Sequence, residues 1–441
     1  MGLQSVFPPI YERVLSNGLR LIAVADRSRD GVVVAFQMPF GRYNDPQGME
    51  GLTDLTAGLV IKGPKEISSE KFSEEFEYRG ASVSASVGEE HTTFMCRTIS
   101  RFFFNLFPLF WETVSSPALD EKEFARLKKE ALTSLQAESV DPSFLVTRHF
   151  FSQLAGHNHP AGRFQKERSL NCLKAEQVKQ FHADTFSPAE AVLVVAGDFD
   201  PASFHQEFQG MLSVWNPQPK QQPVVAQAVK TETPLVRFID KPDLSQTTIM
   251  MGQPFAGEKN PHRNALAVAN YILGAGNFSS RLMAKIRSRY GHTYGISSHI
   301  SSEREFGVFY INTFTQNDNV GEVVASVLEE YRNFCAFGVT SDELEKAKKF
   351  AIGNLSFQLE GIGNVVEKLL WLRLYGRENS FIEQFDKAIN ALELDEVNQL
   401  IKEYFQPELP VMVFAGKKKQ VLSNISGLGY PVKSFSYRDS I

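Results

Sequence analysis

The sequence predicts an α+β fold of two similar domains related by internal duplication, each an antiparallel sheet covered by helices on one face. Two observations predict this fold. Helix and strand patterns recur in the same order at an offset of about 220 residues. Within each half, strand patterns also follow one another without an intervening helix, and such strands pair most simply as antiparallel neighbours.

The first repeated element is an amphipathic helix. DEKEFARLKKEALTSL (120–135) aligns with TSDELEKAKKFAIGNL (340–355). Asp120 and Thr340 are residue types that cap helix N-termini, and each is followed three residues later by a glutamate. We therefore expect a capped helix at the same place in each half.

The second repeated element is a helix, a proline-containing turn and a buried strand. AEQVKQFHADTFSPAEAVLVVAG (175–197) aligns with LDEVNQLIKEYFQPELPVMVFAG (394–416). A weaker third pair is PFGRYNDP (39–46) with PFAGEKNP (254–261). Order and offset agree across the three pairs, which favours duplication over chance.

These repeats predict an N-terminal domain over 1–214 and a C-terminal domain over 235–441. The segment between them, 215–234, is rich in proline and glutamine and poor in large apolar residues. Such a composition is typical of an extended, semi-stiff linker.

The composition is that of a globular protein. The chain has 441 residues, of which 43% are hydrophobic and 22% charged. The 36 phenylalanines predict a core filled by aromatic packing. A net charge of −5 gives no electrostatic case for binding nucleic acid or an anionic membrane. The 3 cysteines are widely spaced, which argues against a disulfide framework or a cysteine-based zinc site.

Targeting and membrane signals are absent from the sequence pattern. The first residues do not combine a basic stretch with a following apolar stretch, as a signal peptide would. The apolar run at 102–111, FFFNLFPLFW, is too short to span a bilayer. We expect a soluble protein with no membrane insertion, and both cytoplasm and periplasm remain open as its location.

Two histidine-containing segments were considered as metal sites. His157 and His159 in GHNHPAG supply half a site, but no third ligand is nearby. We favour a turn whose imidazoles bind backbone groups. GEEH (88–91) stands at a turn before a strand, and we interpret it as a solvated charge cluster.

The sequence gives little support for a nucleotide-binding loop or for a catalytic nucleophile. LGAGNFSSRL (273–282) is glycine-rich, but it lacks the Walker lysine and follows a helical pattern instead of a strand. The sequence has no G-x-S-x-G elbow and no cysteine in an activating setting.

A helix-to-strand junction in the second half carries two candidate oxyanion donors. Ser279 or Ser280 is suited to cap a helix that continues towards Gly291, and TYGISSHI is a strand pattern. Arg287 and Tyr294 lie seven residues apart across this junction. A guanidinium and a phenol held together are good donors to a developing oxyanion, and an ordinary packed pair is the alternative.

From about residue 10 to residue 420, the chain resembles the pitrilysin/insulinase family of inverted-zinc-motif metallopeptidases, in its short two-domain form. The resemblance is carried by LSNGLRLI, GHNHPAG, FSPAEAVLVVAGDFD and NFSSRLMAKIRSRYGHTYGISS. The duplicated α+β half is the fold that this family implies.

The family's zinc motif is altered here. Active members carry H-x-x-E-H on a helix that follows a glycine, and GLTDLTAGLVIKG (51–63) aligns with that stretch. The two histidine positions fall on Asp54 and Gly58, the glutamate position on Ala57, and a third ligand from a later helix on Ser134. The resemblance therefore implies a zinc-motif framework without its ligands, and no cofactor bound by this chain.

The family also implies a role for the second half. Its short members include heterodimers in which one subunit carries zinc and the other an Arg/Tyr pair that binds the substrate carbonyl. Arg287 and Tyr294 match that pair. We expect a non-zinc-binding subunit of a heterodimeric metalloendopeptidase that acts on peptides or small unfolded proteins, active only with a homologous zinc-motif partner. The alternatives are an inactive scaffold subunit and a peptide-binding homodimer.

Overall fold

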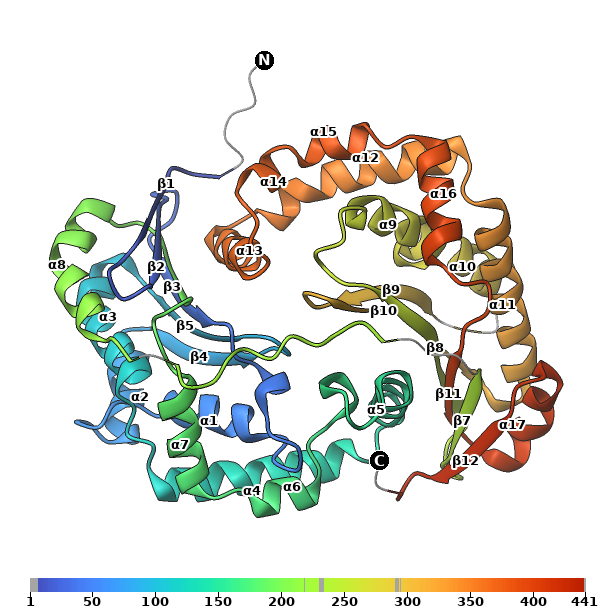
Figure 1. The fold of residues 1–441 in the computed structure, drawn as a ribbon, viewed down its shortest axis with the longest axis horizontal. Helices are drawn as coiled ribbons and strands as arrows, with labels where there is room; N and C mark the ends of the chain where they lie inside the picture. Colours follow the sequence, from blue (N-terminus) through green and yellow to red (C-terminus); the bar gives the residue numbers. More distant parts are fainter. Residues whose placement is uncertain (1–6, 218, 230–233, 290–292, 294, 440–441) are drawn as a thin grey trace. The chain divides into compact units, whose positions relative to one another are not determined.

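The computed structural model describes residues 7–217, 219–229, 234–289, 293 and 295–439, with the backbone alone at 287–289 and 428. They form two compact units (Figure 1). Unit 1 comprises the described residues of 1–133, 165–224 and 356–383, and unit 2 those of 134–164, 225–355 and 384–441. Between 215 and 234 the described residues form neither helix nor strand.

Unit 1 contains a six-stranded sheet in the order β1-β2-β6-β3-β5-β4. β2 and β6 are parallel, and the other neighbouring pairs are antiparallel. The strands are β1 (Ile10–Val14), β2 (Arg20–Ala25), β3 (Val32–Met38), β4 (Ser82–Val87), β5 (Thr92–Thr98) and β6 (Val192–Gly197).

Unit 2 contains a six-stranded sheet in the order β12-β7-β11-β8-β10-β9. β12 and β11 both pair parallel to β7, and the remaining pairs are antiparallel. The strands are β7 (Leu235–Asp240), β8 (Gln246–Ala256), β9 (Ile296–Ser302), β10 (Phe306–Gln316), β11 (Val411–Gly416) and β12 (Val432–Ser436).

Helices occupy most of the remaining chain. Through residue 217 they are η1 (Arg42–Asn44), α1 (Leu52–Val60), α2 (Ser69–Glu77), α3 (Ser100–Ser115), α4 (Glu121–Glu138), α5 (Pro142–Ala155), η2 (Pro160–Gly162), α6 (Glu167–Cys172), α7 (Ala175–Thr185) and α8 (Pro201–Val214). The later ones are α9 (Arg263–Asn270), η3 (Tyr271–Ala275), η4 (Asn277–Ser279), α10 (Arg281–Met283), η5 (Ala284–Arg289), η6 (Asn317–Asn319), α11 (Val320–Phe337), α12 (Ser341–Gln358), α13 (Ile362–Leu374), α14 (Ser380–Glu383), α15 (Phe385–Asn390), α16 (Leu394–Tyr404), α17 (Lys418–Ile425) and η7 (Ser426–Leu428). None of the helices in the described part of the chain is long and apolar enough to cross a membrane.

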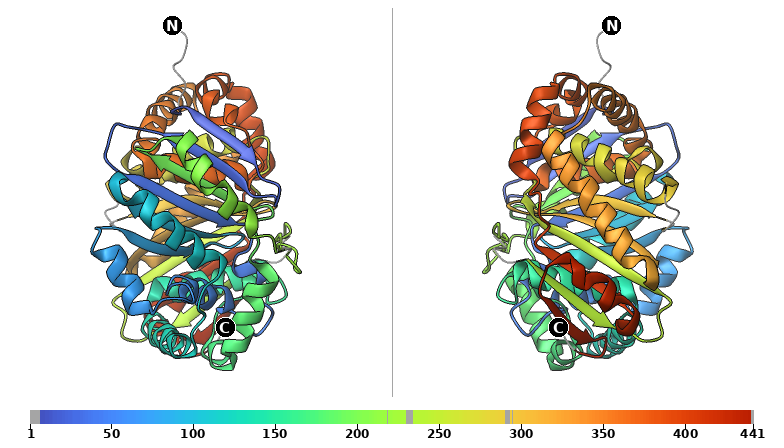
Figure 2. Two further views of the ribbon diagram at one scale, coloured as in Figure 1. Left: turned by 90° about the vertical axis from the view of Figure 1, so that its left-hand side faces the viewer. Right: turned by 90° about the vertical axis from the view of Figure 1, so that its right-hand side faces the viewer.

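The predicted α+β class is confirmed, and the duplicated elements appear where the repeats place them. The strand that ends each repeat pairs in parallel orientation with a strand near the start of its unit, β6 with β2 and β11 with β7. Each sheet is therefore mixed instead of antiparallel throughout, because the helices between these strands provide the long crossover that parallel pairing requires. In Figure 2, α3 and α8 cover one face of the unit 1 sheet, and α11 and α17 one face of the unit 2 sheet.

The repeated helices begin at the predicted caps. Asp120 accepts hydrogen bonds from the backbone N–H groups of Lys122 and Glu123 at 2.8 and 3.0 Å. Thr340 and Glu343 form a reciprocal capping box, in which each side chain accepts from the other residue's backbone N–H.

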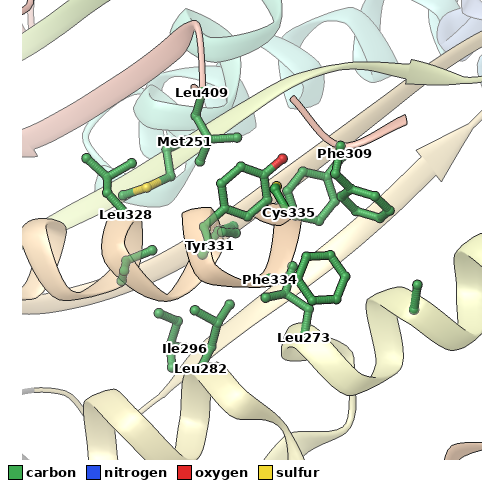
Figure 3. Close-up of a cluster of buried hydrophobic side chains, with 14 of the residues drawn as sticks. Met251, Leu273, Leu282, Ile296, Phe309, Leu328, Tyr331, Phe334, Cys335 and Leu409 are labelled. Carbon is green, nitrogen blue, oxygen red and sulfur yellow. The ribbon is translucent and has the colours of Figure 1, made fainter. Parts of the chain in front are cut away.

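The core of unit 2 supports the segment that leads to Arg287. Figure 3 shows Tyr331, Phe309, Leu282 and their neighbours packed between the sheet and its helices. Tyr331 is fully buried, stacks on Phe309 at 5.6 Å between ring centroids, and donates its hydroxyl hydrogen to Gln253 at 2.8 Å. Leu282 and Ile286 are 0% and 1% exposed, so the turn that carries the Arg287 backbone is anchored from beneath.

One helix packs on the other face of each sheet. α5 lies against β7, β8 and β11 in unit 2, and α13 lies against β3 and β6 in unit 1. Gly252 of β8 makes room for α5, because a Cβ there would lie 2.8 Å from the Phe150 ring. Its neighbour Met251 faces the helical core, so successive residues of β8 serve the two faces.

Replacing Phe150 by alanine tests this packing. The side chain is 0% exposed, and its loss leaves a cavity over Gly252 that backbone cannot fill. We expect Phe150→Ala to lower the free energy of unfolding by about 3–5 kcal/mol in urea denaturation. The control Phe337→Ala, at a position 79% exposed, should change it by less than about 0.5 kcal/mol. Equal effects of the two substitutions would contradict this packing.

His182 of α7 makes the stability of unit 1 sensitive to acid. Its ring packs on Phe186 with a centroid distance of 4.2 Å. Burial lowers the pKa of His182 to about 4, although the backbone of Val114 favours the charged form. A lowered folded-state pKa contributes stability above the unfolded-state value near 6.5, and that contribution is lost as the pH falls towards 4.

We expect this histidine to cause about 2 kcal/mol of the loss in unfolding free energy between pH 7 and pH 5. His182→Phe keeps an aromatic ring and removes the titration, so its unfolding free energy should fall less over that range. Urea denaturation at the two pH values measures this. His157→Gln, at an exposed position, is the control, and an unchanged pH slope in His182→Phe would refute the assignment.

Candidate functional site

The helix of the altered zinc motif, α1, begins at Leu52 with Gly51 as its N-cap at φ 103°. Glycine has no side chain to cap a helix, and Asp45 from the preceding loop takes that role. Its carboxylate accepts from the Gly51 N–H at 2.7 Å, the Thr53 N–H at 2.8 Å and the Thr53 hydroxyl at 2.6 Å. Burial raises the pKa of Asp45 to about 7, against these three hydrogen bonds.

Asp54, at the first histidine position, is bound to an arginine. Arg42 donates from Nε and Nη2 to the two Asp54 carboxylate oxygens, both at 2.9 Å. Its Nη1 donates to Glu89 at 3.3 Å. Burial opposes the charge of Arg42, but hydrogen bonds and charges from Asp54 and Glu89 raise its pKa. The positive charge beside Asp54, at the N-terminal end of α1, is therefore the Arg42 guanidinium.

The other motif positions have no metal-binding side chain. Ala57 is 2% exposed and packs in the core. A Cβ added at Gly58 would meet Leu127 of α4 at 3.7 Å, an ordinary contact. Ser134 lies on α4 with an exposed side chain.

These residues do not fit zinc. A zinc site needs three or four nitrogen, sulfur or carboxylate ligands in near-tetrahedral geometry. Here the one carboxylate already holds a guanidinium, whose charge opposes a second cation, and Ala57 and Gly58 offer no ligand atom. Throughout the described residues, no group of three or more His, Cys, Asp or Glu side chains is placed to hold a metal ion.

The interpretation of GHNHPAG as a structural turn is confirmed for His159. Its Nδ1 accepts from the Ala161 N–H at 3.2 Å, and its Nε2 lies 2.9 Å from the Gln227 carbonyl oxygen. The interpretation of GEEH as a solvated cluster is wrong for Glu90, which is 2% exposed. The turn packs against the loop before α1, since the Arg42 and Tyr43 N–H groups donate to the carbonyls of Gly88 and Glu89.

The oxyanion candidates lie largely outside the described residues. The Arg287 backbone belongs to η5, a π-helical turn, while its side chain, Tyr294 and the predicted helix end at Gly291 are outside them. What precedes this segment is well defined. Ser280 is the cap, its hydroxyl accepting from the Met283 N–H at 3.4 Å. Arg281 binds the Glu343 carboxylate through two hydrogen bonds of 2.6 Å.

Among the described residues, β4 forms one edge of the unit 1 sheet. β4 pairs with β5 on one side and is the last strand in the sheet order. Its side chains, SVSASV, are small and alternate between exposed and half-buried. An edge strand with small side chains can accept an extended peptide through main-chain hydrogen bonds.

Asp45→Ala tests how α1 is held. The substitution leaves the buried N–H groups of Gly51 and Thr53 without an acceptor, and we expect the free energy of unfolding to fall by about 2–4 kcal/mol. Urea denaturation measures this. Asp30→Ala, at an exposed position, should stay within about 0.5 kcal/mol of the native chain. A loss below about 1 kcal/mol for Asp45→Ala would show that another group caps the helix.

Comparison with known proteins agrees with this architecture. A solved structure from Pseudomonas fluorescens, described as a peptidase M16 inactive domain, matches with a TM-score of 0.86 over 93% of this chain and 98% of that chain, at 22% identity. At that identity the match shows the fold.

Curated relatives are similarly distant. An uncharacterized zinc protease of Rickettsia bellii is 24% identical, covering 88% of this chain and 91% of the relative. The non-peptidase homolog YmxG of Helicobacter pylori is 24% identical, covering 84% and 85%. The human mitochondrial-processing peptidase subunit beta is 20% identical, covering 92% and 84%.

Two family descriptions match successive parts of the chain. Residues 20–163 match Insulinase (Peptidase family M16), and residues 173–350 match the Peptidase M16 inactive domain. The first stretch contains α1 with Arg42 and Asp54, and the second contains the segment from Ser280 to Ile296. The chain belongs to the M16 insulinase/pitrilysin family of peptidases and their non-peptidase homologues.

Proposed function

We propose that this chain is the non-zinc-binding subunit of a heterodimeric zinc metalloendopeptidase that acts on peptides or small unfolded proteins. One observation carries the proposal: α1 keeps the zinc-motif helix, while the ligand positions hold an arginine-bound aspartate, an alanine and a glycine. Without ligands no water is activated here, so hydrolysis needs the zinc of a homologous partner subunit.

Arg287 and Tyr294 are the residues through which this chain would act on the partner's substrate. A donor aimed at the position of the oxyanion stabilises the tetrahedral intermediate, and it costs no reorganisation if it is held rigidly. Support for rigidity comes from Leu282 and Ile286, which are buried, and from the Arg281–Glu343 ion pair. The edge strand β4 adds a place where an extended peptide can pair.

The relatives support this choice without deciding it. They include a non-peptidase homologue, zinc proteases and a protein named as a peptidase subunit. The alternative functions are a scaffold subunit and a peptide-binding homodimer, and the experiment below distinguishes the proposal from both.

The test is reconstitution with a homologous subunit that carries an intact H-x-x-E-H motif. Alone, this chain should hold less than one zinc per molecule and cleave no peptide. Mixed with the partner it should give activity, and Arg287→Ala should lower kcat by about 10²–10³-fold because one oxyanion donor is lost. Activity is followed with a quenched peptide, and zinc by mass spectrometry.

Assembly separates a catalytic role from a structural one. The affinity of the two subunits should be unchanged in Arg287→Ala. The control Arg332→Gln removes a surface arginine of the same unit, paired with Glu408, and should keep full activity. Full activity of the zinc partner alone would overturn the proposal. Assembly without any gain in activity would favour a scaffold.

A further inference from the structure

A group of buried polar atoms lies between α5 and the sheet of unit 2. His149 and Ser152 are each 2% exposed, and within the described part of the protein neither the two ring nitrogens of His149 nor the Ser152 hydroxyl has a hydrogen-bond partner. The Gln153 side-chain oxygen is also buried without a partner there. These residues share one face of α5, at spacings of three and four. Buried polar groups in folded proteins are nearly always paired, so this concentration calls for a partner that the described part of the protein does not itself supply.

A half-buried arginine with a buried Nε atom faces the same place from β7. Arg237 donates from Nη1 to the His149 carbonyl at 3.4 Å, and its Nε has no acceptor among the described residues. Burial lowers the pKa of Arg237. Burial also lowers the pKa of His149 to about 4, with Arg237 and Arg148 adding to the shift and Asp439 opposing it. The local field is therefore positive and undercompensated.

Neighbouring charges do not remove this excess. Burial lowers the pKa of Arg148 to about 10, with Glu138 offsetting part of the shift, and its guanidinium lies over the rings of Phe144 and Phe164. From β12, Phe435 reaches the group, and Lys433 is the ladder partner of Arg237. The Phe435 ring centroid lies 5.2 Å from that of His149 and 5.4 Å from the Arg237 guanidinium carbon.

Unit 1 shows what an equivalent place contains when a carboxylate is present. There β1 is the edge strand beside β2, as β12 is beside β7. Glu12 of β1 accepts from Arg20 of β2 at 2.6 Å and from Arg373 of α13 at 3.0 and 2.6 Å. Arginines from the strand and the crossing helix thus share one carboxylate. In unit 2 the strand supplies Arg237 and the crossing helix supplies Arg148. The edge strand brings the phenyl ring of Phe435 instead of a carboxylate.

We propose that Arg237, His149 and Ser152 form a binding site for an oxyanion, a carboxylate or a phosphate group, which Phe435 covers. A guanidinium, an imidazole N–H and a hydroxyl are donors that together match such an anion. The cover is an edge strand whose neighbouring strand is β7, and four of its five residues are exposed. Displacing it breaks pairing with one neighbouring strand, so an anion on a flexible segment, or a free one, can reach the donors.

The test titrates the full-length chain with inorganic phosphate and, separately, with acetate, at constant ionic strength made up with chloride. We expect a saturable rise in melting temperature and a shift of the His149 ring signals in NMR spectra. Arg237→Gln should weaken binding at least about tenfold, as loss of a charge-assisted hydrogen bond predicts. Arg332→Gln, which removes a surface arginine of the same unit, should leave it unchanged.

Each result of the anion titration either supports the proposed oxyanion site or overturns it. Binding of phosphate alone or acetate alone identifies the kind of oxyanion, and binding of both supports a general oxyanion site. No saturable response to either anion beyond that of chloride, or an equal response in Arg237→Gln, overturns the proposal.

Two substitutions of Phe435 test the proposed oxyanion site independently of the Arg237 variant. Phe435→Glu places a carboxylate where Glu12 stands in unit 1. It should abolish binding of added anions and raise the pKa of His149 in an NMR titration. Phe435→Ala should strengthen anion binding severalfold by opening the site. If Phe435→Glu folds but leaves anion binding and the His149 titration unchanged, the group is packing and the proposal fails.

Discussion

The two hydrogen bonds between Arg42 and Asp54 set the charge at the start of α1. The proposed function rests on this pair, because Asp54 is the residue that we align with the first histidine of the zinc motif. The Arg42 guanidinium supplies the positive charge there, and it donates hydrogen bonds to the carboxylates of Asp54 and Glu89. The pair is half exposed and adds roughly 0–1 kcal/mol to stability, so its importance is positional. Together with the Asp45 cap, it ties the start of α1 to the loop that precedes it.

The two units show how a duplicated fold diverges while its backbone persists. Both have six strands, a helical layer on one face and a crossing helix on the other. They differ in what the edge strand contributes at the crossing helix. Glu12 joins two arginines in unit 1, whereas Phe435 covers Arg237 and His149 in unit 2. A single side chain on the least constrained strand therefore changes the electrostatics of a buried region, because charges in a low dielectric act strongly over short distances.

Catalytic residues and the scaffold that supports them obey different constraints. A Cβ at Gly58 would meet only an ordinary contact with Leu127, so the packing of α1 does not by itself require a glycine there. By contrast, the turn that leads to Arg287 is tied to the core by Leu282 and Ile286 and to α12 by an ion pair. The proposed function depends on this anchored turn and not on the residues of α1.

Local patterns in the sequence determined the elements of the fold. The repeated helices, their caps at Asp120 and Thr340, and the buried strands β6 and β11 all follow from periodicity and short-range chemistry. The segment that we align with the zinc motif is a helix, α1. These features depend on residues within a few positions of each other, so one sequence suffices to predict them.

Tertiary structure decided the rest. Arg42 contacts Asp54 across a loop and Glu89 across a turn. Glu90 is buried because its turn packs against the loop between β3 and α1. Parallel strands enter both sheets through long crossovers. His149 meets Arg237 and Phe435 although 88 residues separate His149 from Arg237, and Phe435 is more distant still. No local pattern marks such partners, because their proximity is set by strand order and helix packing.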